Sequence, residues 1–236
     1  RIPEMFREAC RHAMSHRRGP VALNIPRDLL AETIECEPFQ SPAQYRPALL
    51  PDGGADLVTR AVALLSGAER PLIITGGGIK YNRAYGPVLE LAGLLGAPVA
   101  TAPGHGDAIP FDHPLNAGQV GPRGNVVASA LAKEADVILA LGTRLGFNTT
   151  FYSWDNLNRA ARIIHVEMEP TAIGRYFPVE LGIQGDAGRV AAQLARELRS
   201  HRAGAAAQRW LSKFTSDRRK LLEERDAAGA QLADPI

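Results

Sequence analysis

Three consecutive glycines after an apolar run have the clearest chemical potential in this sequence. Residues 71–75, PLIIT, have the length and composition of a strand, and they lead directly into Gly76, Gly77 and Gly78. Because glycine has no Cβ, its backbone can approach a phosphate closely and present N–H groups to the anion. The triplet lacks the spacing of the GxGxxG fingerprint and the Lys and Ser/Thr of a P-loop. Both a phosphate site and a simple tight turn therefore stay open.

Strand and helix signals alternate on both sides of this glycine triplet. Uninterrupted apolar runs such as LIIT and VILAL are typical of parallel strands that are buried on both faces. We predict an α/β protein: a three-layer α/β/α Rossmann-like domain with a mainly parallel central sheet. Strands are predicted at 71–75, 98–101, 136–141, 162–168 and near Gly182, with a strand-like segment PVALNI at 20–25. Helices are predicted at about 2–16, 54–66, 85–95, up to Glu134, near Thr171, and at about 187–199 and 208–226, with a long loop at 102–124.

Ligands in such sheets bind beyond the carboxyl ends of the strands, so the residues that follow each strand are the candidates for a site. Arg144 could bind a diphosphate, or it could form a surface ion pair. Glu167 could accept hydrogen bonds from ribose hydroxyls, or cap the next helix. Asp186 is equally suited to capping the helix that follows it. The residues after the strands are Gly76 to Gly78, Thr101 to Gly104, Gly142, Thr143, Arg144, Glu167, Met168, Gly185 and Asp186.

Composition excludes several classes of protein. The 236 residues are 45% hydrophobic and carry a net charge of +2, which gives no electrostatic case for nucleic acid. The sequence has no run near the ~20 apolar residues that span a bilayer and no signal-like start, so we expect a cytoplasmic protein. Cys10 and Cys36 fit neither a redox pair nor a zinc site, and we predict no metal ligands. Because the chain starts at Arg1 and ends in a linker-like Asp-Pro-Ile, we expect a fragment of a longer polypeptide.

Six motifs in order resemble the central domain of the thiamine diphosphate-dependent 2-oxo acid enzymes, above all the acetolactate synthase large subunit. They are GPVALNIPRD, RPLIITGGG, GAPVATAPG, ADVILALGTR, IIHVEMEPTAIG and QGDA. The resemblance implies that residues 1–30 end the pyrimidine-binding domain and that 31–50 form a linker. It further implies that 51–202 form the central domain, with a fold of the DHS-like NAD/FAD-binding type, and that 203–236 form a helical linker toward the third domain.

The resemblance implies a parent carboligase that uses thiamine diphosphate and magnesium, a small 2-oxo acid substrate and a homo-oligomeric assembly. The family's activating glutamate and its magnesium motif have no match in this chain, so we expect no catalytic residue here and no activity from the fragment alone. Gly185-Asp186-Ala187 does not fit the magnesium motif. The central domain would bind FAD or an adenine nucleotide. Its implied contacts are Arg17, Gly76, Gly77, Gly78, Thr101, Arg123, Gly142, Thr143, Arg144, Glu167, Met168 and Asp186.

Two departures from the family pattern affect the flavin expectation. Leu145-Gly146-Phe147-Asn148 stands where flavin-binding members carry an acidic pair followed by arginine, and Arg123 stands where they often carry histidine. An adenine nucleotide, coenzyme A or an empty site therefore stays open. The parent could equally be a flavin-free relative, such as a sulfoacetaldehyde acetyltransferase or a 2-oxo acid decarboxylase. His105, His113 and Arg123 are further candidates in the glycine- and proline-rich loop.

Two hypotheses from other classes compete with this interpretation. An NAD-dependent deacylase of the sirtuin type would share the general fold, but it usually needs a four-cysteine zinc module, and this chain has two cysteines. A pure interaction module would use the glycines only as turns. Retention of a nucleotide by the purified protein would separate a cofactor domain from such a module.

Overall fold

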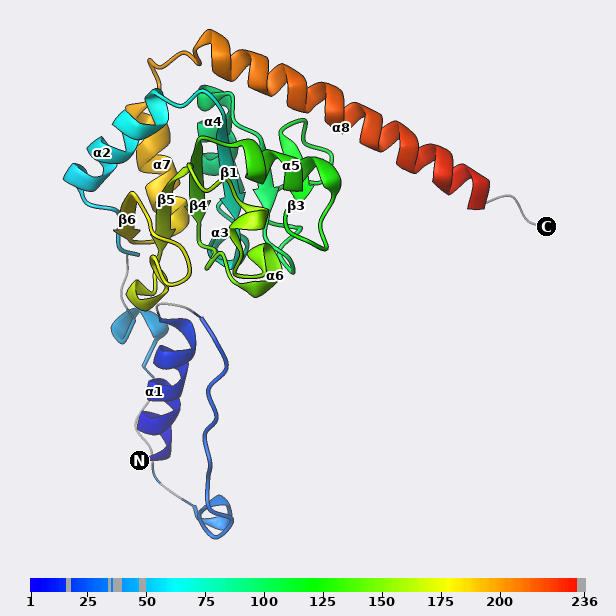
Figure 1. Cartoon of the computed structure of the whole chain (residues 1–236). Coiled ribbons are helices and arrows are strands. Elements are labelled where there is room, and N and C mark those ends of the chain that lie inside the picture. Colours follow the sequence, from blue (N-terminus) through cyan, green and yellow to red (C-terminus); the bar gives the residue numbers. More distant parts are fainter. Residues whose placement is uncertain (16–17, 34, 36–39, 47–49, 233–236) are drawn as a thin grey trace. The chain divides into compact units, whose positions relative to one another are not determined.

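A parallel sheet forms the centre of the computed structural model, which describes residues 1–15, 18–33, 35, 40–46 and 50–232 (Figure 1). Within these residues the sheet has six strands in the order β3-β2-β1-β4-β5-β6, and every pair is parallel. This confirms the predicted sheet. The strands are β1 (Pro71–Thr75), β2 (Val99–Thr101), β3 (Asn116–Gln119), β4 (Val137–Leu141), β5 (Arg162–Glu167) and β6 (Leu181–Gln184).

Helices cover both faces of the sheet, as the uninterrupted apolar strands require. One face packs on α2, α4 and α7, with Ile73 and Leu139 in the contact. The other face packs on α5 and α8, with Leu72 and Ile138 in the contact. The described helices are α1 (Ile2–Met14), α2 (Ala55–Ser66), α3 (Gly77–Asn82), α4 (Tyr85–Leu95), α5 (Val126–Glu134), α6 (Phe147–Thr150), α7 (Ala187–Glu197) and α8 (Ala205–Leu232), with single turns at Leu29–Ala31, Pro42–Gln44, Trp154–Asn156 and Pro170–Ala172. The three-layer α/β/α prediction is confirmed.

The chain divides into two compact units, Arg1–Leu50 and Pro51–Ile236. In the first unit, α1 buries none of its residues and carries the ion pairs Arg1–Glu4 and Glu8–Arg11 on its surface. The second unit contains the whole sheet. None of the helices in the described part of the chain is long and apolar enough to cross a membrane.

Two predictions about local structure were wrong. The segment PVALNI at 20–25 forms no strand, because a strand needs a neighbour to pair with and the described part of the first unit offers none. The loop predicted at 102–124 contains β3, which pairs with β2 at the edge of the sheet. Its sequence, NAGQ, has no β-branched or aromatic residue, so propensity gave no strand signal. The last helix, α8, also begins earlier and ends later than the predicted 208–226.

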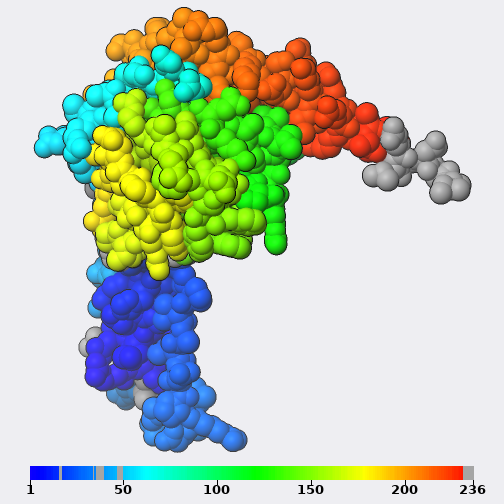
Figure 2. Space-filling view, in the orientation of Figure 1, coloured from blue at the N-terminus to red at the C-terminus, as the bar shows by residue number. Residues whose placement is uncertain are grey.

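Helix α8 is attached to the sheet by its first half. Phe214 is 0% exposed, and the Trp210 indole Nε1–H donates to the Pro71 carbonyl at 3.0 Å. Arg218 Nε donates to the Asn116 carbonyl at 2.9 Å. Beyond this point α8 has fewer contacts: residues 223–230 are exposed, although Leu221 still packs on the core and the Arg225 guanidinium lies 5.4 Å from the Phe111 ring. The red end of the helix extends past the body of the unit (Figure 2).

We predict that Phe214→Ala destabilises the protein by about 3–5 kcal/mol, because it removes a fully buried ring from the contact between α8 and the sheet. Urea-induced unfolding measures the change. The matched control, Lys220→Ala, changes an exposed residue of the same helix and is expected to stay within about 0.5 kcal/mol of the parent. Equal effects of the two substitutions would show that α8 is not anchored through Phe214.

Candidate functional site

The strand order creates a crevice at the carboxyl ends of β1 and β4. The chain continues from β1 to β2 on one side and from β4 to β5 on the other, so the loops that follow β1 and β4 diverge. Ligands of open α/β sheets bind at such a switch point. The register pairs Thr75 with Leu141, so the next residues, Gly76 and Gly142, leave the sheet side by side. Two groups of predicted site residues therefore meet here.

The glycines of these two loops are in direct backbone contact. Gly76 N–H donates to the Leu141 carbonyl at 3.1 Å, and Gly78 N–H donates to the Gly142 carbonyl at 3.0 Å. Gly142 has a φ of +60°, and a Cβ on it would lie 2.6 Å from Gly78 Cα. The glycines thus have a packing role, and the N–H groups of Gly76 and Gly78 already have protein acceptors. Phosphate binding by the triplet stays a prediction.

Thr143 and Arg144 follow Gly142, and the first is buried while the second is exposed. Thr143 is buried, and its carbonyl accepts a hydrogen bond from His165 Nε2 at 2.8 Å. Arg144 is exposed, and among the described residues no acidic side chain is recorded in an ion pair with it. Arg144 thus lies directly after β4 with an exposed side chain, and its role in binding an anion stays a prediction.

The predicted residues on β2 and β5 are largely buried. The Thr101 hydroxyl is buried and has no hydrogen-bond partner among the described residues. Glu167 is 7% exposed, and its Oε1 accepts from the Met168 N–H at 2.9 Å. Met168 itself is half-buried. The role of Glu167 as a ribose acceptor stays a prediction.

Asp186 caps helix α7, the alternative that the sequence left open. Its Oδ1 accepts from the Arg189 N–H at 2.9 Å, and its Oδ2 accepts from the Asn82 amide. Both carboxylate oxygens therefore have protein donors, while a ligand role stays a prediction. Arg123 is exposed in the loop between β3 and α5. Arg17 lies outside the described residues.

His165 links two loops of this edge from inside the protein. The Thr143 carbonyl can only accept, so the proton of the ring lies on Nε2, and Nδ1 accepts from the Gly174 N–H at 3.4 Å. Burial lowers the pKa of His165, against a smaller opposing effect of the bond to Thr143. A neutral His165 thus holds the loop after β4 to the loop after β5. Sequence reasoning missed this residue because it lies inside a strand.

Aromatic side chains of the loop after β4 contact one another and Tyr176. Phe147 stacks on Phe151 with ring centroids 4.7 Å apart, and Tyr152 contacts Tyr176 at 4.6 Å. Phe151 and Tyr152 have φ values of +49° and +56°, which non-glycine residues rarely adopt. The inner side of the same loop is buried, and the Thr150 hydroxyl donates to the Leu145 carbonyl at 3.0 Å.

The loop after β2 adds residues that sequence reasoning did not group. Lys80 of α3 pairs with Asp107 at 3.0 Å, and the Tyr81 ring meets the His105 ring edge-on at 6.2 Å. His105 was a candidate, whereas Lys80 and Asp107 were not, because they lie 27 positions apart in the chain. His113 serves its own loop, where Nδ1 accepts from the Leu115 N–H at 3.2 Å.

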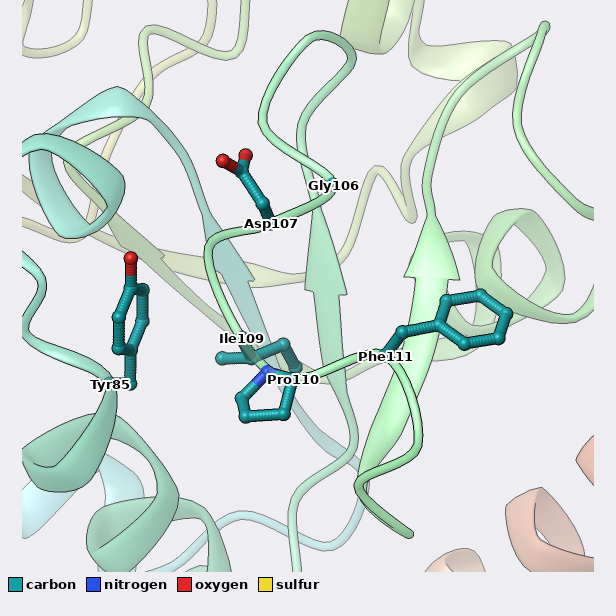
Figure 3. A pocket seen from close by; sticks show the side chains of 6 residues that line it. All are labelled: Tyr85, Gly106, Asp107, Ile109, Pro110 and Phe111. Atoms are coloured by element: carbon teal, nitrogen blue, oxygen red, sulfur yellow. The ribbon is translucent and has the colours of Figure 1, made fainter.

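A shallow cavity of about 420 Å³ lies beside this loop. Tyr85 faces Ile109 and Pro110 across it, and Phe111 points away from Tyr85 (Figure 3). The other lining residues are Gly106 and Asp107. The walls are mostly apolar and carry one carboxylate, so the cavity does not suit a phosphate. The described residues also contain no cluster of His, Cys, Asp and Glu that could hold a metal ion.

We predict that Gly142→Ala destabilises the protein by about 2 kcal/mol or more, because the new Cβ meets Gly78 and the backbone has a positive φ. The control is Gly93→Ala, since Gly93 is an exposed residue of α4 whose Cβ would meet no atom within 4 Å. That change is expected to stabilise by up to about 1 kcal/mol. Urea-induced unfolding compares both, and an undiminished stability of Gly142→Ala would contradict the packing role.

We also predict an acid-sensitive stability that depends on His165. Its pKa in the folded protein is below the ordinary 6.5, so the unfolded chain binds the proton more readily and stability falls as the pH drops below that value. His165→Leu is expected to be less stable near neutral pH, but to lose less on going from about pH 7 to about pH 5. Thermal unfolding at both pH values measures this. The exposed His12→Gln is the control and should keep the parent's acid loss; an equal loss in His165→Leu would refute the assignment.

Comparison with known proteins identifies the family of this chain. The family described as thiamine pyrophosphate enzyme, central domain, matches residues 58–194. A sulfoacetaldehyde acetyltransferase of Rhodobacter capsulatus is 39% identical over 229 residues, which cover 92% of this chain and 38% of the relative. A probable acetolactate synthase large subunit of Methanocaldococcus jannaschii is 32% identical over 206 residues, covering 84% of this chain and 34% of the relative.

A solved structure supports the fold. The X-ray structure of a thiamin diphosphate-dependent enzyme from Mycobacterium smegmatis superposes with a TM-score of 0.65 at 23% identity, over 83% of this chain and 37% of that one. The chain thus spans little more than a third of the length of these relatives. The resemblance of the six motifs is confirmed: the chain belongs to the thiamine pyrophosphate enzymes, and residues 58–194 match the central domain of that family.

Proposed function

We propose that this chain is the central scaffold and nucleotide-binding part of a thiamine diphosphate-dependent carboligase. The observation that carries the proposal is the match of residues 58–194 to the family's central domain. The thiamine cofactor supplies the carbon–carbon chemistry in such an enzyme, and the protein supplies orientation and electrostatics. We infer that residues 1–30 form the end of a pyrimidine-binding domain and that residues 31–50 are a linker after it. Residues 51–202 are then the central domain, and residues 203–236 lead to a third domain.

Among carboligases, we favour an acetyltransferase that acts on sulfoacetaldehyde over an acetolactate synthase. Over the aligned residues, two sulfoacetaldehyde acetyltransferases are 39% and 40% identical to this chain, compared with 32% for a probable acetolactate synthase large subunit. The loop after Arg144 also lacks the acidic pair that the flavin-binding branch is expected to carry. An acetolactate synthase stays the second candidate, supported by the glycine triplet and Arg144 at the expected positions.

The described part of the chain has no cluster of His, Cys, Asp and Glu that could hold a metal ion, and the magnesium of the parent stays a prediction. A nucleotide at the crevice has more support. Arg144 is exposed there, and the Thr101 hydroxyl is buried without a partner among the described residues. Because Asp186 and two glycine amides are already bonded within the protein, we infer a limited contact through Arg144, which suits the diphosphate of an adenine nucleotide better than a whole flavin. A homo-oligomeric parent and a cytoplasmic location remain predictions.

We predict that ADP raises the thermal unfolding midpoint of the purified chain by a few degrees and that FAD does not, because only ligands that bind the folded state stabilise it. Arg144→Ala should abolish the shift, whereas Arg209→Ala, an exposed arginine of α8, should keep it. Coenzyme A is tested alongside, and an absorbance scan tests for retained flavin.

The outcomes separate the candidates. A yellow protein, or stabilisation by FAD alone, would favour the acetolactate synthase branch. No shift with any nucleotide would contradict the nucleotide proposal and leave a scaffold domain. The chain supplied with thiamine diphosphate and magnesium is expected to show no acetyl transfer from sulfoacetaldehyde, and turnover by the chain alone would contradict its role as a non-catalytic part.

A further inference from the structure

His105 lies where the loop after β2 meets the start of α3. A Cβ on Gly77 would come within 3.2 Å of His105 Cε1 and 3.0 Å of Tyr81 Cε2, so the ring fits closely against this turn. The ring is half-buried at the carboxyl edge of the sheet. Its place depends on the absence of a side chain at Gly77, which gives the middle glycine of the triplet a role of its own.

Two cations from different elements act on His105. Burial is the main cause of its lowered pKa, and the charges of Lys80 and Arg144 lower the pKa further, while Asp107 opposes them. Lys80 belongs to α3 and Arg144 to the loop after β4, and Tyr81 of α3 is the other titratable group against the ring. Lys80 and Arg144 thus bring positive charge near His105, and Asp107, which pairs with Lys80 at 3.0 Å, offsets part of it.

Two buried polar atoms of the loop after β2 and its strand lack partners among the described residues. His105 Nδ1 and Thr101 Oγ1 are both buried and have no hydrogen-bond partner among the described residues, and Thr101 is 1% exposed. A buried Nδ1–H without an acceptor would be costly, so the neutral ring carries its proton on Nε2. His105 can then donate through Nε2 without being charged.

We propose that His105, Lys80 and Arg144 bind the oxyanion group of a small molecule, with His105 as a neutral donor through Nε2. A sulfonate and a phosphate share this chemistry, since both present tetrahedral oxygens to donors and cations. The choice of a sulfonate as the natural group rests on the proposed function, because sulfoacetaldehyde carries one. The arrangement of the three side chains does not depend on that function.

The test is nuclear magnetic resonance of the histidine ring nitrogens in the 236-residue chain. Isethionate serves as the sulfonate, inorganic phosphate and ADP as the phosphates, and chloride as the control salt. The spectra of His105 are expected to show the Nε2–H form. Isethionate or phosphate, but not chloride, should raise the pKa of His105 because a bound anion favours the charged ring. His12 and His113 in the same spectra should not respond.

Substitutions around the ring give opposite expectations. Lys80→Met and Arg144→Met should each weaken isethionate binding by about tenfold, because each removes a charged donor. Asp107→Asn should strengthen it, because Asp107 now pairs with Lys80 at 3.0 Å. Arg209→Met, far along the chain on α8, should change nothing. Thermal unfolding verifies that each variant is folded.

The responses to isethionate and to ADP distinguish the oxyanion site from the nucleotide proposal. Binding of isethionate with no response to ADP would support the oxyanion site while refuting the nucleotide proposal. A response of His105 to ADP alone would keep the nucleotide proposal and overturn the site for a small oxyanion. No response to any anion, equal responses of His105 and His12, or weaker binding by Asp107→Asn would also overturn it.

Discussion

The backbone contact between Gly78 and Gly142 is the constraint on which the carboxyl edge of this domain depends. It joins the loop after β1 to the loop after β4 through a hydrogen bond of 3.0 Å, with no side chain between them. Because β1 and β4 are parallel and Thr75 pairs with Leu141, the two loops begin at the same level of the sheet. Because the loops meet there, Lys80 of α3 and Arg144 after β4, which are distant in sequence, come to the same edge of the sheet.

The fold could be predicted because the strand and helix signals in the sequence are local and strong. Runs such as PLIIT and VILAL leave no face for solvent, so a parallel sheet with helices on both sides is the arrangement that buries them. The order of six motifs indicated the family. The edge strand β3 was not predicted, because its residues NAGQ have low strand propensity. They form a strand because the fold places them beside β2. The prediction for residues 20–25 was wrong for the opposite reason: the segment has the composition of a strand, but it has no partner strand among the described residues.

The sequence indicated where the residues of the candidate site lie, but not their contacts. The rule that ligands bind beyond strand ends predicted that Thr101, Gly142 and Arg144 share the carboxyl edge of the sheet, where the structure places them. It could not show that Gly76 and Gly78 use their N–H groups on the protein itself, or that Asp186 has both oxygens occupied. Nor could it find the Lys80–Asp107 pair, which depends on how two loops fold against each other.

The loop after Arg144 is divided between two kinds of residue. Leu145 and Thr150 face inward and hold the backbone, whereas Phe147 and Tyr152 are each 52% exposed. A change at Phe147 removes ring contacts at the surface but opens no cavity in the core, so it costs less stability than a change at the inner residues. Tyr152 also has a φ of +56°, which limits the residues that its backbone accepts. In evolutionary terms, the outer side of the loop can vary between lineages more readily than the inner side, which is tied to the fold.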